Sequence, residues 1–455
     1  MRPLLLATPA LLSVSLLACT TPADEDGPDG AAAAAQPPFA KAFEGTAQPW
    51  SLAVGPEGDI FFAGTYSWDL DFGGGPLTAE PKGSLFLAHL DAAGEHIFSG
   101  STASGSEDRP WDVAVGPVGD LYVVGFFSGN INFGSGKMSG EQDGFFAAFE
   151  EDGSPDHSFS AKGASYDALT TVTTTPAGDV IVAGRVGDDV DLGAGPNEEQ
   201  LGLRTALAAY DPDGAHLWEL RFPADLFNRV ELASDGAGNV YVAGEAWTDV
   251  EIGTLSASPG VVVLKLGPSG EPLWIRSTGT DGGGPRLSGL GVDAAGDVVI
   301  VGTYYDAFTM DGFVAAQPYV AEGGYVAKLT GAGDTRFLKT FQLHNYGAWV
   351  TTAVSREGDT VVAVNTYSSV DFGAGPVGQV DGNGSDIVLA RYDAGGALTA
   401  TKHLPGNASE NVWGVAMSPD GAPVLVGTFT GELEIGEETL VSTDGSNLFV
   451  GRLDL

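Results

Sequence analysis

The sequence predicts an all-β protein, a seven-bladed β-propeller with four antiparallel strands per blade, and three observations lead to this prediction. Two short apolar runs joined by a glycine turn recur seven times in the 455 residues, at spacings of 58 to 63 residues. Each period has room for four short strands, and no helical periodicity of apolar residues occurs after residue 20. The two ends of the repeated region also complement each other. The turn glycines are Gly58, Gly119, Gly178, Gly238, Gly296, Gly358 and Gly421.

Each period is expected to form strands a, b, c and d, from the innermost to the outermost. In the first period they cover residues 50–54, 59–66, 84–91 and 95–101. The turns between c and d also end in glycine, which suits hairpin loops because glycine adopts positive φ without steric cost. These glycines are Gly94, Gly153, Gly214, Gly270, Gly333 and Gly396.

The ends of the chain predict how the ring closes. The chain stops where the other units turn from c to d, so the last unit lacks a d strand. Residues 39–44 (FAKAFE) precede the first a strand and have no a, b or c strand of their own. We therefore expect this N-terminal strand to pair with residues 447–453 and to complete the last blade without an open sheet edge.

A second repeated phrase supports the same fold. Residues 69–77 read DLDFGGGPL, echoed by NINFGSG, DVDLGAGP, VEIG, VDFGAGP and LEIG in other units, while the fifth unit has Thr309-Met310-Asp311-Gly312 there. With the glycine hairpins, this pattern resembles the bacterial seven-bladed β-propeller repeat family (SBBP type) over residues 39–455. The resemblance implies an exported protein or lipoprotein, and it implies no common reaction.

The N-terminus is predicted to direct export. Residues 1–18 are predicted to be a lipoprotein signal peptide: an apolar stretch over residues 4–17 follows Arg2, and Leu16-Leu17-Ala18-Cys19 resembles a lipoprotein lipobox. That resemblance implies that the Cys19 thiol carries lipid; an ordinary secretory signal is the alternative. Residues 19–38 are then the lipidated cysteine and a flexible tether. Thr20 is not the aspartate of inner-membrane retention, which places the protein in the cell envelope, at the outer membrane of a Gram-negative bacterium.

The amino-acid composition limits the kinds of partner that the protein is expected to bind. The chain has 60 Asp and Glu residues against 20 Lys and Arg, a net charge of −40. Such a surface repels nucleic acid and anionic headgroups, so a nucleic-acid partner is excluded, and the membrane is reached through the lipid on Cys19. Cys19 is also the only cysteine, so the folded part has no disulfide and no thiolate metal site. We expect a monomer.

The candidate binding site lies on the face that carries the d–a and b–c loops, which vary in length while the other turns repeat. Three of the seven residues located eight positions before the turn glycines are tryptophans, on neighbouring blades of a closed ring. Indole rings beside polar groups suit a glycan or protein at the cell surface, whereas packing between blades is the alternative role. The predicted site residues are Trp50, Arg109, Trp111, Tyr166, Asn228, Arg286, His344, Trp349 and Trp413.

No catalytic or metal motif is evident. Asp71, Asp191, Glu251, Asp371 and Glu434 recur in hairpins, but apolar residues separate the acids, so turn roles are favoured over calcium and no cofactor is expected. The six histidines lack metal-ligand spacing, and there is no Gly-x-Ser-x-Gly motif. The predicted function is a non-catalytic binding or scaffolding module. The alternatives are a hydrolase or lyase at the channel mouth and a purely structural envelope component.

Overall fold

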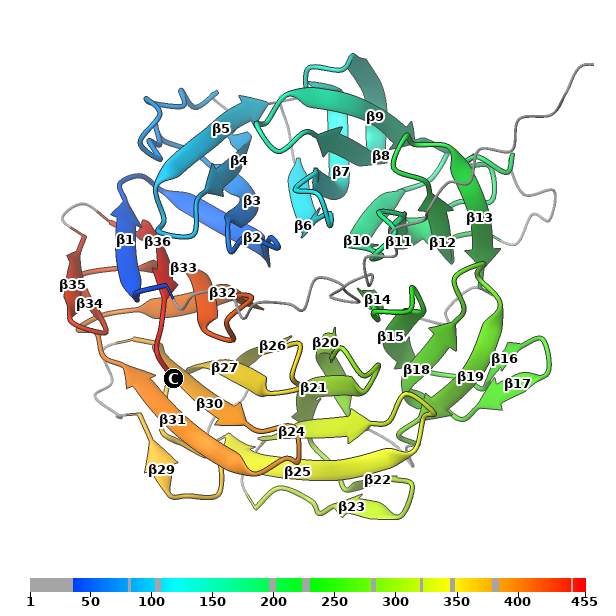
Figure 1. Ribbon diagram of the computed structural model, residues 1–455, viewed down its shortest axis with the longest axis vertical. Helices are drawn as coiled ribbons and strands as arrows, with labels where there is room; N and C mark the ends of the chain where they lie inside the picture. Colours follow the sequence, from blue (N-terminus) through cyan, green and yellow to red (C-terminus); the bar gives the residue numbers. More distant parts are fainter. Residues whose placement is uncertain are drawn as a thin grey trace, which may run out of the picture.

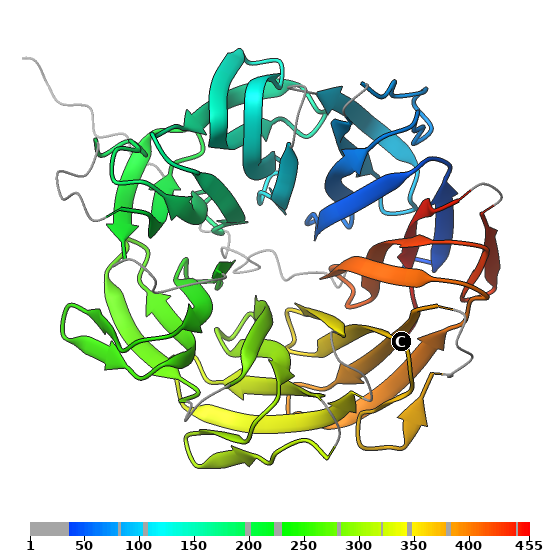
Figure 2. The same cartoon turned by 180° about the vertical axis from the view of Figure 1, so that it is seen from behind.

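The computed structural model describes residues 36–80, 83–102, 108–195, 202–222, 230–279, 284–319, 322–343, 348–378, 384–442 and 445–455. These residues form strands and turns only, and seven antiparallel blades of four strands each surround a central channel (Figure 1). The sheet of blade 5 is extended by two short strands that lie between blades 5 and 6 in sequence and pair with its outermost strand. The view from behind shows the same ring (Figure 2). The predicted seven-bladed propeller is therefore confirmed. Within the described ranges, no helix is long and apolar enough to cross a membrane.

The blades follow the chain in order, and in each of the first six the chain runs from the innermost strand outward. The strands, from a to d, are β2 (Ala47–Val54), β3 (Ile60–Tyr66), β4 (Ser84–Leu90) and β5 (His96–Thr102) in blade 1; β6 (Arg109–Val115), β7 (Leu121–Asn132), β8 (Lys137–Phe149) and β9 (Pro155–Ala161) in blade 2; β10 (Ala168–Thr174), β11 (Val180–Val186), β12 (Arg204–Tyr210) and β13 (His216–Arg221) in blade 3; β14 (Val230–Ser234), β15 (Val240–Ala246), β18 (Gly260–Leu266) and β19 (Pro272–Ser277) in blade 4; β20 (Arg286–Val292), β21 (Val298–Tyr304), β24 (Glu322–Leu329) and β25 (Thr335–Leu343) in blade 5; β26 (Trp349–Val354), β27 (Thr360–Thr366), β30 (Asp386–Tyr392) and β31 (Leu398–Leu404) in blade 6; and β32 (Glu410–Met417), β33 (Pro423–Phe429), β36 (Asn447–Arg452) and β1 (Phe39–Phe43) in blade 7.

The core lies between neighbouring blades. The b and c strands are buried on both faces, as in β4 with the sequence SLFLAHL, because each blade packs against a neighbour on either side. One apolar cluster joins blades 7 and 1 through side chains such as Phe43, Phe62 and Val426. Equivalent clusters join the other pairs, so each blade is stabilised chiefly by its neighbours.

The ring closes as the sequence predicts. β1 pairs antiparallel with β36, from Phe39 opposite Arg452 to Phe43 opposite Leu448. A polar clamp reinforces this junction: the Arg452 guanidinium donates to the Asp420 carboxylate, and the Gln36 N–H donates to the same carboxylate at 3.1 Å. The Arg452 Nε also donates to the Gln36 carbonyl at 3.3 Å. The first and last strands of the propeller therefore share one sheet.

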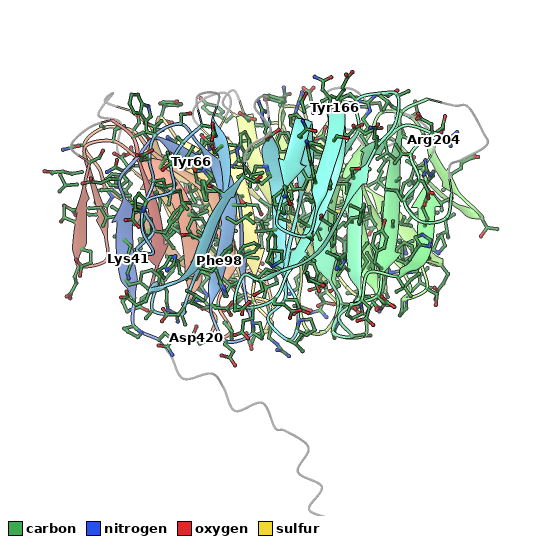
Figure 3. The ribbon with its side chains drawn as sticks, turned by 90° about the horizontal axis from the view of Figure 1, so that it is seen from above. Lys41, Tyr66, Phe98, Tyr166, Arg204 and Asp420 are labelled. Carbon is green, nitrogen blue, oxygen red and sulfur yellow. The ribbon has the colours of Figure 1, made fainter. Side chains whose placement is uncertain are left out.

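The two faces of the ring differ. The a–b and c–d turns lie on one face, here called the turn face, and the d–a and b–c connections lie on the other, the loop face. Asp420 marks the turn face at the lower edge of Figure 3, and Tyr166 marks the loop face at the upper edge. Because Gln36 bonds Asp420, the chain enters the propeller on the turn face. The predicted signal peptide, most of the tether and Cys19 lie outside the described residues.

The repeated DLDFG-type segments form small turns beside the blades. Asp71 Oδ1 accepts hydrogen bonds from the N–H groups of Gly73 and Gly75 at 2.8 and 3.0 Å. Asp191 and Asp371 likewise accept from the N–H groups of the glycines two and four residues after them. These bonds lower the pKa of Asp191. The predicted turn role is thus confirmed for these three acids. The accessory strands are β16 (Val250–Ile252), β17 (Leu255–Ala257), β22 (Phe308–Met310), β23 (Phe313–Ala315), β28 (Val370–Asp371), β29 (Pro376–Val377), β34 (Glu432–Ile435) and β35 (Glu438–Val441).

Candidate binding site at the mouth of the central channel

A bulge in the innermost strand shapes the channel mouth. In five blades the a–b pairing skips one residue, eight positions before the turn glycine. A bulged residue has no partner across the ladder, and the bulge re-aims the side chains around it. Three of the five unpaired residues are the predicted tryptophans. The unpaired residues are Trp50, Trp111, Thr170, Ser288 and Trp413.

The bulge explains why the b strand carries glycine opposite it. A Cβ added to Gly184 would lie 2.0 Å from the Ala168 carbonyl oxygen, and one added to Gly64 would lie 2.3 Å from that of Gln48. The same approach occurs in the other bulged blades. Blade 6 has Val364 at this position, and there the a–b pairing is regular. Every bulged blade therefore has glycine at this position, because only glycine admits the displaced carbonyl, whereas blade 4 has Gly244 there with a regular pairing.

The tryptophans form two contacting pairs in four adjacent blades. Trp50 and Trp111 meet edge to face, with ring centroids 5.2 Å apart. The Arg109 guanidinium carbon lies 5.2 Å from the Trp50 ring and 5.6 Å from the Trp111 ring, within the range of cation–π attraction. On blades 6 and 7, Trp349 and Trp413 have centroids 5.7 Å apart. The rings are partly buried by one another and partly open to the channel.

The hydrogen bonding of the indoles differs between blades. Trp50 Nε1 donates to Thr65 Oγ1 at 3.3 Å, and Trp413 Nε1 donates to Thr428 Oγ1 at 3.1 Å. In blade 2, Phe126 occupies the position of these threonines and packs against Trp111, with centroids 6.2 Å apart. Trp111 Nε1 is therefore buried without an acceptor. A buried hydrogen-bond donor with no partner is rare in proteins, so the lining of the channel mouth in blade 2 differs from that in blades 1 and 7.

Beneath the aromatic rings, the channel encloses a cavity of about 690 Å³ lined by the a strands of all seven blades. Asp112 bridges three blades in its wall. Its Oδ1 accepts from Ser51 Oγ at 2.7 Å, and its Oδ2 accepts from Thr171 Oγ1 and the Val172 N–H, each at 2.9 Å. Burial raises the pKa of Asp112 to about 6, Glu231 adds to the rise, and the hydrogen bonds oppose it.

The cavity wall also contains a cation. Arg185, in β11, lines the cavity, and its guanidinium makes no hydrogen bond or ion pair with the described residues. Arg185 and the indoles together give the cavity planar apolar surfaces with a hydrogen-bond donor beside them.

The structure brings together five of the predicted site residues around the cavity. Tyr166 contacts Phe126 with centroids 5.5 Å apart, and Arg109 covers two of the indoles from above. Arg286 does not line the cavity; its side chain is exposed at the start of β20. Asn228 and His344 lie outside the described residues. The cavity-lining residues among those predicted are Trp50, Trp111, Tyr166, Trp349 and Trp413.

The sequence analysis missed the polar lining of the cavity. Asp112 and Glu231 occupy the position seven residues before the turn glycine, which in the bulged blades directly follows the bulge. The sequence did contain a signal for this lining. Most residues at this position of the repeat carry a hydroxyl or a carboxylate, although the strands are otherwise largely apolar. The residues in this column are Ser51, Asp112, Thr171, Glu231, Gly289, Thr351 and Gly414.

The part of the chain that the structure describes holds no group of three or more His, Cys, Asp or Glu side chains suited to a metal ion. The described histidines have structural partners instead. His89 is fully buried and bonds the Asp59 carboxylate through Nε2 at 2.6 Å and the Glu151 carbonyl through Nδ1 at 3.1 Å. His89 therefore links two blades and lies far from the channel mouth, near the turn face.

No protein-family model matches this sequence, and no curated protein matches it. Several solved structures are similar to the chain, among them the following three. They are a protein of unknown function from Bacteroides caccae (13% identity, 70% of this chain and 89% of the other, TM-score 0.37), a chain of a mitotic checkpoint complex (9%, 97% and 99%, 0.45) and a glucose dehydrogenase (13%, 76% and 96%, 0.37). At these TM-scores the likenesses carry no argument about function. The resemblance to the SBBP-type family remains a prediction from the repeat.

Proposed function

We propose that the protein is a non-catalytic binding module, anchored by lipid on Cys19 in the cell envelope, that takes a glycan or protein segment at the mouth of its channel. The observation that carries the proposal is the cavity of about 690 Å³ flanked by two tryptophan pairs and Arg109. Aromatic faces supply contact area at low entropic cost, and a few polar groups fix orientation.

The location of the site supports this proposal. The chain enters the propeller on the turn face, where Gln36 bonds Asp420, so a tether attached there leaves the loop face and the channel mouth open to partners. A purely structural envelope component has no need for a polar, partly open cavity with an unpaired guanidinium. The predicted anchor has its own test: Cys19→Ser should move the protein from the membrane fraction to the soluble fraction.

A hydrolase or lyase is the second candidate, and one observation favours it. Asp112, with its pKa raised to about 6, is in electrostatic contact with Glu231 in the same cavity. A carboxyl group whose pKa is raised by burial beside a second acid is typical of general acid–base sites. Against catalysis, the oxygens of Asp112 already accept from Ser51, Thr171 and two backbone N–H groups. Such a carboxylate is better suited to holding blades together than to transferring a proton.

Titration of the full chain against a panel of cell-surface oligosaccharides and peptides tests the proposal. Four of the eight tryptophans lie at the channel mouth, so binding should change the intrinsic fluorescence. Trp111→Ala and Trp349→Ala should each weaken binding at least 30-fold, which corresponds to about 2 kcal/mol for an aromatic anchor. Chromatography of the mixtures shows whether any ligand is cleaved.

Trp218→Phe is the matched control. Trp218 lies at the turn-face end of β13, where its Nε1 donates to the Pro268 carbonyl at 3.0 Å, so this variant should bind as the unmodified protein does. Wild-type affinity in both channel variants would overturn the proposed site. Cleavage of a bound ligand that is lost in Asp112→Asn would establish the enzymatic alternative.

A further inference from the structure

Among the described residues, the exposed Trp and Tyr side chains belong to one face of the propeller. In the described part of the chain, six Trp and Tyr side chains are strongly exposed, and all six lie in b–c or d–a connections or at their junctions with strands. The turn face has none among the described residues. Exposing such rings forfeits the stabilisation of burial, so a one-sided distribution points to contact with a partner. The six are Trp68, Tyr166, Trp247, Tyr319, Trp349 and Tyr367.

Three aromatic residues occupy the same position in three successive blades. Trp247, Tyr305 and Tyr367 each follow directly after the b strand, in blades 4, 5 and 6. Trp247 and Tyr367 are each 62% exposed. Tyr319, in the same b–c connection of blade 5 as Tyr305, is 98% exposed. The repeat therefore places a row of aromatic platforms along one arc of the loop face, here called the aromatic arc.

The neighbours of these rings are polar. Asp249 follows Trp247 by two residues and Asp306 follows Tyr305 directly; both are exposed, and neither carboxylate hydrogen-bonds a described residue. Ser368 follows Tyr367. The centres of protein–protein interfaces are depleted of Asp and Glu, so this composition does not favour a protein partner. Nor does it favour a nucleic acid, an anionic polymer or an anionic membrane, because the chain carries a net charge of −40.

We propose that the aromatic arc binds an extended neutral polysaccharide whose chain runs over blades 4 to 6 towards the channel mouth at Trp349. Sugar rings stack their C–H faces on flat aromatic rings, and sugar hydroxyls donate to the free carboxylates of Asp249 and Asp306. In blade 6, Trp349 lies opposite Asn365, which precedes Tyr367 of the arc by two residues, and it contacts Trp413 of the cavity site, so it lies between the two. This inference rests on the proposed function and names its ligand class.

A chain-length series with the full-length protein tests the proposal. The probes are neutral β-glucan, xylan and mannan with their trisaccharides, and polygalacturonate as an anionic polymer. Trp247→Ala/Tyr367→Ala should weaken binding of one neutral polymer at least tenfold and leave its trisaccharide unaffected, because only the long chain spans both regions. Trp218→Phe alters a tryptophan at the turn-face end of β13, away from the arc, and serves as the control. Circular dichroism should confirm that all variants fold.

The outcomes separate this inference from the proposed function. If the double variant binds the polymer as tightly as the unmodified protein does, binding by the aromatic arc is refuted and the cavity site is unaffected. Preference for polygalacturonate, or binding of peptides only, overturns the neutral polysaccharide while the binding module stands. If no probe binds, both ideas fail. If Trp111→Ala loses binding of both the polymer and the trisaccharide, while the double variant loses binding of the polymer alone, the cavity site and the aromatic arc are both supported.

Discussion

Phe43→Ala should destabilise the propeller as a whole, although Phe43 belongs to a five-residue strand at the edge of the fold. The Phe43 side chain is buried between blades 7 and 1, and its ring lies 5.0 Å from that of Phe72. Truncating a buried phenylalanine to alanine costs about 3–5 kcal/mol. That is a large part of the 5–15 kcal/mol that is typical of the net stability of folded proteins.

The reason for a global effect is topological. β1 is the only contribution of the N-terminus to blade 7, and its loss exposes the edge of β36. Weakening this junction therefore opens the ring and removes one neighbour from each of two blades. We expect Phe43→Ala to unfold at lower denaturant concentration in a single transition, and to be cleaved near residue 43 faster in limited proteolysis.

Equilibrium unfolding in urea, followed by tryptophan fluorescence, measures the change in the free energy of unfolding. Lys41→Ala in the same strand is the control, since its ion pair with the exposed Glu95 contributes at most about 1 kcal/mol. A loss below about 1 kcal/mol for Phe43→Ala, or a separate early transition that leaves the remaining blades at full stability, would refute the cooperative closed ring.

Four further predictions concern stability. Asp420→Asn should destabilise the protein in urea unfolding at neutral pH, because Arg452 lowers the folded pKa of Asp420 and the stabilisation belongs to the ionised form; the difference should persist down to about pH 4, near the unfolded pKa, and shrink only as the pH falls further. The reverse sign holds for Asp112, whose pKa rises from 3.8 to about 6: relative to Asp112→Asn, the unmodified protein should lose up to about 3 kcal/mol as the pH rises from 4 to 7 in urea titrations. Lys328→Ala should lower the free energy of unfolding in urea by about 3–5 kcal/mol, because it removes the ion-pair partner of the buried Asp293 carboxylate. A Lys328→Met/Asp293→Asn double variant as unstable as Lys328→Ala would contradict this explanation. Gly184→Ala should cost at least about 1–3 kcal/mol in the same assay through its clash with a backbone carbonyl, and an unchanged midpoint would argue against the bulge as the cause of that glycine.

The sequence was sufficient for the architecture because the repeat encodes each blade separately. Glycine turns, apolar b and c strands and the unpaired strands at both ends together specify the seven sheets and the β1–β36 junction. Strand ends differ by a few residues from those expected: β2 begins at Ala47 rather than at residue 50, ahead of the bulge at Trp50. The bulge itself is hard to foresee, because its signal is a glycine on the neighbouring strand.

The candidate site was predicted less completely, and the reason is the same bulge. The tryptophans could be located because they share one position in the repeat. The roles of Asp112 and Arg185 could not be predicted in this way. Their orientation towards the cavity depends on how the bulge turns the strand and on the residues of the neighbouring blades. Arg286 was grouped with the cavity because it precedes an a strand, but its side chain is exposed outside the cavity lining. Loop position alone does not determine side-chain direction.

The ring closure and the aromatic site depend on one another. The tryptophan pairs lie on blades 6 and 7 and on blades 1 and 2. Blade 7, which β1 completes, is therefore one of the four adjacent blades that carry them. The core shared by blades 7 and 1 sets the separation of Trp413 from Trp50, although the two residues are far apart in sequence. Binding that spans both pairs must therefore stabilise the closed ring by mass action. A ligand of the channel mouth should thus recover part of the stability lost in Phe43→Ala, measured as a higher urea midpoint at saturating ligand.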